Sequence, residues 1–371
     1  MTAVDSESMG KRIADARTRT GMTQAGLAAA IGIDRSALAK IENGTRRVSA
    51  LELARIAEAT RERIEWFVLQ VPEAIVSHRN MQDPGAESPV IDRIVETFAW
   101  NTEFLLKHDD RLRLESPGPL AKPGTNDEAE RTAREARKLM GLGPSEPLLN
   151  IVEAVAKIGL FTLSRDLGPD AADAASVLLA RGGVAVINGH LLVGRRRLAL
   201  AHELGHYLFA DEYTVDWRIA EKDDDNAWES RLDRFARAVL LPADGLTEAW
   251  HTARKDGDLR TTAVKVASKF RVDMSTLSRR LVETGVLGTH DAASVRSVRT
   301  TKADIIELNL VTRDELAATS LSLEYQQAVL RLYKQEVISP ARATELLYDT
   351  LNEDDLPPLP PLPESAIWDF T

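Results

Sequence analysis

The chain has 371 residues, of which 44% are hydrophobic and 28% are charged, a balance typical of a soluble globular protein. We expect two or three domains from this length. The absence of cysteine excludes disulfide bonds, thiolate metal sites and cysteine nucleophiles, and it fits a cytoplasmic protein. No apolar run is long enough to cross a membrane, and residues 1–9 lack the apolar stretch of a signal peptide.

The formal net charge of −10 argues, taken alone, against a nucleic-acid-binding protein. The charge is unevenly distributed, however. Residues 1–70 hold 11 Lys and Arg against 9 Asp and Glu, a net of +2. A locally basic face can bind DNA while the rest of the molecule is acidic. We therefore expect any contact with DNA to come from the N-terminal part.

Residues 9–70 are predicted to form short helices separated by turns. The signals, in chain order, are the caps Thr23, Asp34 and Ser49, a capping box completed by Glu52, and stops at Gly21, Gly32 and Gly44. Two short helices joined by a glycine-containing turn form a helix-turn-helix motif, whose second helix faces outward. The predicted buried face comprises Leu27, Ile31, Leu38 and Ile41.

The outward helix would enter the major groove of double-stranded DNA. The side chains predicted to face the bases are Asp34, Arg35, Ser36, Ala37 and Lys40, and those suited to phosphate contacts are Gln24, Arg46 and Arg47. A homodimer that reads two half-sites of an operator is the usual geometry. The alternative is a helical bundle that binds protein, since Ala37 and Ala39 offer little base readout.

These residues resemble the Cro/C1-type (XRE) helix-turn-helix domain. The resemblance is carried by four segments, Arg12–Arg17, Gly21–Ala28, Gly32–Gly44 and Leu51–Ala57. It implies a five-helix bundle that binds DNA and regulates transcription.

Residues 71–130 are predicted to be a helix, Ile91–His108, followed by a breaker-rich linker at 116–124. The predicted fold class of the whole chain is mainly α with a small β-sheet (α+β), and the sheet lies within residues 131–290. Predicted helices cover 128–140, 148–158, 195–210, 228–241, 261–270 and 274–284, and predicted strands cover 160–164, 176–179 and 184–187.

Residues 291–371 are predicted to form a helical C-terminal region, with its helices within Ala303–Tyr348, that ends in a proline-rich tail. A capping-box pattern at Thr312 and Glu315 and a helix start at Ser339-Pro340 support the helices. These helices would cover the preceding domain or form a dimer. We also consider that residues 367–370 dock on a partner or on the active-site groove.

His202-Glu203-Leu204-Gly205-His206 has the H-E-x-x-H pattern. On a helix, residues four apart share one face, so both imidazoles can bind one metal ion. Glu203 lies about 100° around the helix from His202, where it can take a proton from water at the metal without binding the metal itself. The pattern therefore predicts a zinc-dependent peptidase with Glu203 as the general base.

Two histidines alone hold zinc poorly, so a third ligand is required. Asp211 and Glu212 are candidates by spacing, but the pattern with a ligand at that distance needs a glycine where this chain has Phe209. Glu229 is preferred because it begins a second helix and is followed by Asp233 on the same face. Asp233 would accept the N–H of a ligand histidine and fix its tautomer. The apolar face predicted to pack this helix against the first comprises Leu232, Phe235, Ala236, Val239 and Leu240.

The segments Arg195–Phe209 and Glu229–Pro242 resemble the ImmA/IrrE family of metallo-endopeptidases, with Leu232 in place of a small residue and Val239 in place of a leucine. The resemblance covers about residues 130–290. It implies that His202, His206 and Glu229 bind zinc and that Glu203 is the catalytic base. Many relatives carry an N-terminal helix-turn-helix and act in phage, mobile-element or stress regulation, and some cleave a repressor.

The sequence thus predicts a DNA-binding transcriptional regulator with a zinc endopeptidase domain that cleaves a protein partner, such as a repressor. One alternative is a transcription factor whose peptidase-like domain senses a metal, ligand or partner without cleaving it. Another is an antitoxin whose C-terminal part binds a toxin. The intact Glu203 favours catalysis, because a sensor does not need a base.

Overall fold

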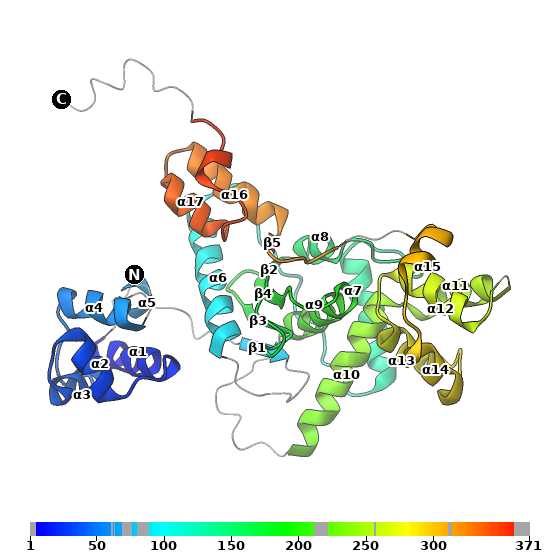
Figure 1. Ribbon diagram of the computed structural model, residues 1–371, viewed down its shortest axis with the longest axis horizontal. Coiled ribbons are helices and arrows are strands. Elements are labelled where there is room, and N and C mark those ends of the chain that lie inside the picture. Colours follow the sequence, from blue (N-terminus) through cyan, green and yellow to red (C-terminus); the bar gives the residue numbers. More distant parts are fainter. Residues whose placement is uncertain are drawn as a thin grey trace. The chain divides into compact units, whose positions relative to one another are not determined.

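The computed structural model describes residues 5–60, 62, 64–68, 76–79, 89–210, 222–255, 257–310 and 314–359 (Figure 1). Contacts between Cα atoms divide the chain into two units, residues 1–74 and 75–371. The helix Pro89–His108, in the region expected to be helix and linker, packs within the second unit. Each unit has its own core of buried apolar side chains.

The first unit is a bundle of five short helices, as predicted (Figure 1). In chain order they are α1 (Ser6–Arg19), α2 (Gln24–Ile31), α3 (Arg35–Glu42), α4 (Ala50–Thr60) and α5 (Ile64–Val68). The predicted buried face is confirmed, because Leu27, Ile31, Leu38 and Ile41 are at most 2% exposed. Apolar side chains of all five helices meet in one core.

Local signals set the ends of the short helices in the first unit. At the start of α2, Thr23 accepts a hydrogen bond from Gly26 N–H, and at the start of α4, Ser49 and Glu52 form the predicted capping box. Gly32 ends α2 with φ +74°, a left-handed conformation that glycine adopts without strain. Asp34 occupies the N-cap position of α3, but its side chain makes no capping hydrogen bond.

The second unit is built on a five-stranded mixed sheet of order β1-β3-β4-β2-β5. Its strands are β1 (Val76–Arg79), β2 (Leu160–Arg165), β3 (Ala174–Leu178), β4 (Gly183–Asn188) and β5 (Ser320–Leu321). β2 and β4 are parallel, and the other neighbouring pairs are antiparallel. The three central strands agree with the predicted ones, whereas the two short edge strands were not predicted.

Helices make up most of the second unit. They are α6 (Pro89–His108), α7 (Asn126–Leu139), α8 (Ile151–Ala156), α9 (Val193–Leu208), α10 (Lys222–Leu240), α11 (Ala243–Lys255), α12 (Leu259–Phe270), α13 (Met274–Glu283), α14 (Thr289–Ser297), α15 (Lys302–Glu307), α16 (Leu323–Lys334) and α17 (Pro340–Leu346), with a 3₁₀ turn at Glu353–Asp355. Sequence reasoning missed α11 and α14. No helix in the described part of the chain has the length and apolarity needed to span a membrane.

Both faces of the sheet are covered by helices. α6 and α9 each contact β3 and β4, and every residue of β4 is buried (Figure 1). α10 packs against α9, and its predicted apolar face is buried in the same core. Gly205 makes this approach possible, since a Cβ there would lie 2.8 Å from Cδ2 of Leu232. The close packing brings the middle of α10, from Glu229 to Leu232, beside the H-E-x-x-H segment.

The prediction that Glu315 belongs to a helix capping box is wrong, because residues 314–319 form no helix and Thr312 lies outside the described residues. The Glu315 carboxylate instead accepts hydrogen bonds from the N–H groups of Ile151 and Val152 at the start of α8. It also pairs with the buried guanidinium of Arg197 on α9. Tertiary partners, rather than a local helix, satisfy this side chain.

The C-terminal helices α16 and α17 belong to the second unit. α16 packs against α6, where the ring of Tyr325 lies 5.1 Å from that of Phe98. Ser339 caps α17 with Pro340 in its first turn, as predicted. The prolines beyond residue 359 and residues 367–370 lie outside the described residues.

Candidate functional site

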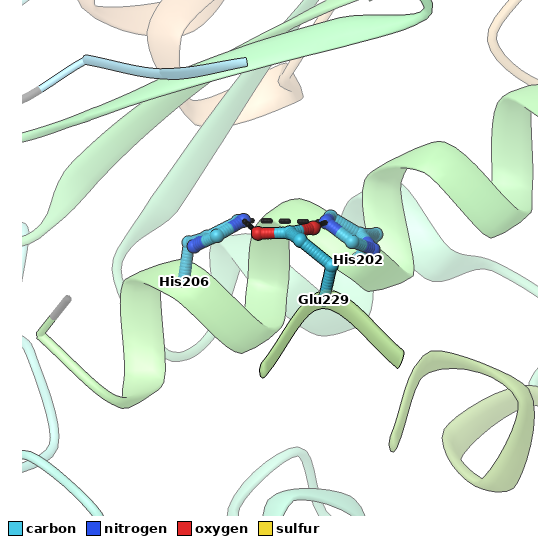
Figure 2. A group of neighbouring side chains, drawn as sticks. All are labelled: His202, His206 and Glu229. Atoms are coloured by element: carbon cyan, nitrogen blue, oxygen red, sulfur yellow. Dashed lines mark hydrogen bonds and ion pairs between the residues drawn. The ribbon is translucent and has the colours of Figure 1, made fainter. Parts of the chain in front are cut away.

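Three side chains from two helices converge on one point of the second unit. His202 and His206 lie four residues apart on α9, and their Nε2 atoms are 3.2 Å apart. Glu229 of α10 places Oε2 3.1 Å from Nε2 of His202 and Oε1 3.9 Å from Nε2 of His206. Figure 2 shows the carboxylate between the two rings. Within the described residues, these three form the group whose geometry suits a metal ion.

The tautomer of His202 supports metal binding. Its Nδ1 atom lies 3.0 Å from Oδ1 of Asp233, and a carboxylate at that distance holds the imidazole proton on Nδ1. The lone pair of Nε2 is then directed toward His206 and Glu229. Two nitrogen donors about 2.0–2.1 Å from a tetrahedral ion lie roughly 3.3 Å apart, close to the observed 3.2 Å. The donor set therefore fits one metal ion.

Glu203 lies beside this cluster without belonging to it. The side chain is fully buried, and Ser176 of β3 donates a hydrogen bond of 2.6 Å to its Oε2. Its Oε1 is buried and has no hydrogen-bond partner among the described residues. Burial raises the pKa of Glu203, while His206, His202 and Ser176 act in the opposite direction. A carboxylate with one fixed and one unpaired oxygen is equipped to exchange a proton with a bound molecule.

Glu229 does not begin its helix as predicted, because α10 already starts at Lys222, and packing in the middle of this helix holds its side chain in place. The ring of the preceding residue, Trp228, contacts the ring of Phe209 just beyond the end of α9 at 5.6 Å. Burial opposes ionisation of Glu229, but its interactions with His202 and then His206 outweigh burial and lower its pKa. Glu229 is therefore an ionised, half-buried carboxylate of the kind that binds a cation.

Asp233 is itself held by charged partners. Arg237, one turn further along α10, has NH1 3.6 Å from Oδ2 of Asp233, and its NH2 lies 2.7 Å from Oε1 of Glu283 on α13. Contacts thus run from Glu283 on α13 through Arg237 and Asp233 on α10 to His202 on α9, and they orient the ring of this histidine. Sequence spacing pointed to Asp233 but missed Arg237, Glu283 and Ser176. The contacts of Glu283 and Ser176 are distant in sequence, whereas Arg237 lies four residues after Asp233 and could have been found from helix spacing.

The rival third ligands, Asp211 and Glu212, lie outside the described residues. Two other histidines have partners away from the cluster. His108 stacks on Phe104, and His190 lies 3.1 Å from Asp166.

In the first unit, the residues predicted to contact DNA have different surroundings. Along α3, Arg35, Ser36 and Lys40 are exposed and Ala37 is half-buried, while Asp34 is exposed just before the helix. Gln24 donates its amide to the buried carboxylate of Glu42, which also pairs with Arg17. Arg46 pairs with Glu52, whereas Arg47 is exposed. Arg47 is therefore better placed than Arg46 for a phosphate contact.

Together, the fold and the site define a protein with a helix-turn-helix domain and a metallopeptidase-like domain. Residues 13–67 match the family model described as helix-turn-helix. Residues 156–282 match the peptidase M78 family model, described as IrrE N-terminal-like domain. The chain is thus a fusion of an XRE-type helix-turn-helix with an IrrE/ImmA-like domain.

The search of curated proteins gave no match. Among solved structures, the restriction-modification controller protein C.AhdI from Aeromonas hydrophila is 31% identical over 16% of this chain and 92% of its own, with a TM-score of 0.16. PlcR from Bacillus thuringiensis, solved with the peptide PapR7 and DNA, is 13% identical over 92% of each chain, with a TM-score of 0.18.

Proposed function

We propose that this protein is a DNA-binding transcriptional regulator that also acts as a zinc-dependent endopeptidase on a protein partner, such as a repressor. The observation that carries the proposal is the position of Glu203, a buried carboxylate with one unpaired oxygen next to three converging ligands. A site that only sensed a metal would not need this group.

Two histidines and one carboxylate are a ligand set found in catalytic zinc sites, which keep a fourth position for water or substrate. His202, His206 and Glu229 would hold the ion, which when bound supplies Lewis acidity toward water and the peptide carbonyl.

The chain's own residues carry the proton through the reaction. Glu203 accepts a proton from the attacking water as the new C–O bond forms, and it returns this proton to the amide nitrogen as the C–N bond breaks. Ser176 holds Oε2 of Glu203, so Oε1 remains available for the transfer. Asp233 keeps the ring of His202 in its metal-binding tautomer throughout.

DNA binding is proposed for the first unit. The exposed side chains of α3 would read base edges, and Arg47 would bind a phosphate. A homodimer would place two such helices on an operator.

The peptidase proposal is tested with the variant Glu203→Gln. Zinc-loaded wild type and variant are incubated with an extract of the source cells, and newly formed protein N-termini are identified by mass spectrometry. We expect the wild type to create specific N-termini and Glu203→Gln to create them about 10²- to 10⁴-fold more slowly. Glu248→Gln, an exposed carboxylate of α11, is the matched control and should behave like wild type.

Zinc content separates the possible outcomes. The wild type and Glu203→Gln should each bind one zinc ion, and His206→Ala should lose it. Proteolysis at this site would be contradicted if Glu203→Gln created the same N-termini at the wild-type rate, or if the zinc-loaded wild type created none. Such a result would leave the protein as a metal sensor or an antitoxin.

A further inference from the structure

The edge strand β1 lies next to the candidate site. It pairs antiparallel with β3, with Ser77 opposite Ser176, and it also contacts α9 (Figure 1). Ser176 in turn holds Glu203 at 2.6 Å. β1 is outside the family-matched residues 156–282. β1 therefore comes from outside the matched domain, and it pairs with β3, the strand whose Ser176 holds the proposed base Glu203.

This position matters because Glu203 is fixed to β3. A peptide whose backbone exchanges a proton with Glu203 must pass close to that strand. Extended peptides commonly bind a sheet by adding a strand at an edge, where main-chain groups offer hydrogen bonds. β3 has two edges, and one is taken by β4, with Ala175 opposite Val186. The other edge is the one that β1 covers.

We propose that β1 is an internal occupant of the peptide-binding edge of this site. A substrate segment in extended conformation would take its place by pairing antiparallel with β3. This inference rests on the proposed peptidase function and specifies the substrate class, an extended chain segment. It also gives the resting protein a built-in competitor for peptides.

The dimensions of β1 suit an occupant that can leave and return. The strand has only four paired residues, from Val76 to Arg79, so few main-chain hydrogen bonds hold it. Residues 69–75 join it to α5 and residues 80–88 join it to α6. A segment tethered at both ends keeps an effective concentration on the order of millimolar at its site. A substrate must therefore bind well enough to outcompete β1, which disfavours chance peptides.

Two variants test the inference in opposite directions. In His78→Cys/Ala175→Cys, the cysteines face each other in the register, and antiparallel partners have Cα atoms about 4.5–5.5 Å apart, a separation that a disulfide bridges. The chain has no other cysteine, so only this bond can form within it. In the second variant, four glycines replace Val76–Arg79 and weaken the pairing.

The probe is a fluorescent peptide with the sequence of residues 72–83, and its binding to the full chain is followed by anisotropy in the presence of EDTA. We expect the glycine variant to bind the peptide at least tenfold more tightly than the oxidised cysteine variant, with wild type in between. Dithiothreitol should return the cysteine variant to wild-type affinity. A scrambled peptide of the same composition is the control.

Equal affinity in the oxidised and glycine variants would overturn the inference, as would binding of the scrambled peptide. If the disulfide does not form, the glycine variant decides, because an affinity equal to that of wild type also overturns it. The assay contains no zinc, so it reports occupancy and not cleavage. Peptide binding at the β3 edge could thus be established even if the Glu203→Gln experiment refuted the peptidase function. Equally, the peptidase function could be established even if this assay showed that β1 does not compete with the peptide.

Discussion

Replacing Asp233 by alanine should weaken zinc binding while leaving the fold intact. The carboxylate lies 3.0 Å from Nδ1 of His202, and loss of such a partner typically lowers metal affinity about 10- to 100-fold. That loss corresponds to about 1.4–2.7 kcal/mol. Asp233→Asn should lie between wild type and alanine, because the amide oxygen still accepts the imidazole N–H but without a negative charge.

The metal-free protein should be much less affected. Arg237 is 3.6 Å from Asp233 and keeps its closer partner Glu283 at 2.7 Å, so the substitution leaves no isolated buried charge. We expect the free energy of unfolding in EDTA to change by less than about 1 kcal/mol. At a zinc concentration one hundred times the wild-type Kd, zinc should stabilise the wild type by about 2.7 kcal/mol and Asp233→Ala by about 0.4–1.4 kcal/mol.

Competition with a chromophoric chelator measures the affinity, and denaturant unfolding with and without zinc measures the stability. Glu248→Gln serves as the control, since its exposed side chain on α11 should leave both quantities unchanged. If Asp233→Ala bound zinc as tightly as wild type, the assignment of Asp233 as the group that orients His202 would be refuted.

Three further predictions follow from other parts of the fold. Gly205→Ala should destabilise the metal-free protein by about 1–2 kcal/mol, because its Cβ would lie 2.8 Å from Leu232. In a double-mutant cycle monitored by denaturant unfolding, Leu232→Ala should cost less stability in the Gly205→Ala protein than in the wild type. Strictly additive losses of stability would contradict the clash. The pKa of Glu130 is lowered in the folded protein because Arg280 outweighs the effect of burial. The ionised Glu130 therefore contributes its full stabilisation above its ordinary pKa of about 4.5. This stabilisation is lost as the pH falls through the lowered pKa of the folded state. Glu130→Gln should therefore cost about 3 kcal/mol at pH 7, and its unfolding curve should approach that of wild type under acid; a constant difference would argue against the pair. Arg47→Ala should weaken DNA binding for all sequences and reduce the slope of log K against log salt by about 1, and an unchanged slope would exclude a phosphate contact.

Much of the local structure could be predicted because the signals lie within a few residues. Thr23 and Ser339 cap the helices whose starts they indicate, and the spacing of apolar residues identified the buried faces of α3 and α10. The E-x-x-x-D spacing likewise pointed to Glu229 and Asp233, which the structure brings to His202. Each of these inferences needs only residue type and spacing within a few positions of the chain.

The remaining features depend on tertiary partners that no local pattern reveals. Pro242 ends α10 as expected, but α11 begins at the next residue, because proline suits the start of a helix as well as its end. Glu315 has the spacing of a capping box, yet it bonds to residues more than 150 positions away. β1 and β5 are too short to show an alternating pattern, and their pairing depends on the edges of the assembled sheet.

The contact between Glu315 and Arg197 determines how much of the polypeptide can fold independently. A shorter protein ending at residue 290 would still include the matched residues 156–282, but it would lack Glu315 and β5. The Arg197 guanidinium, which is 0% exposed, would lose its carboxylate, and β2 would lose a neighbour. Stranding a buried charge costs about 3–5 kcal/mol, a large share of the stability of an ordinary domain. Recombinant fragments for biochemistry should therefore extend from residue 75 to at least residue 356, well beyond the limits of the matched family.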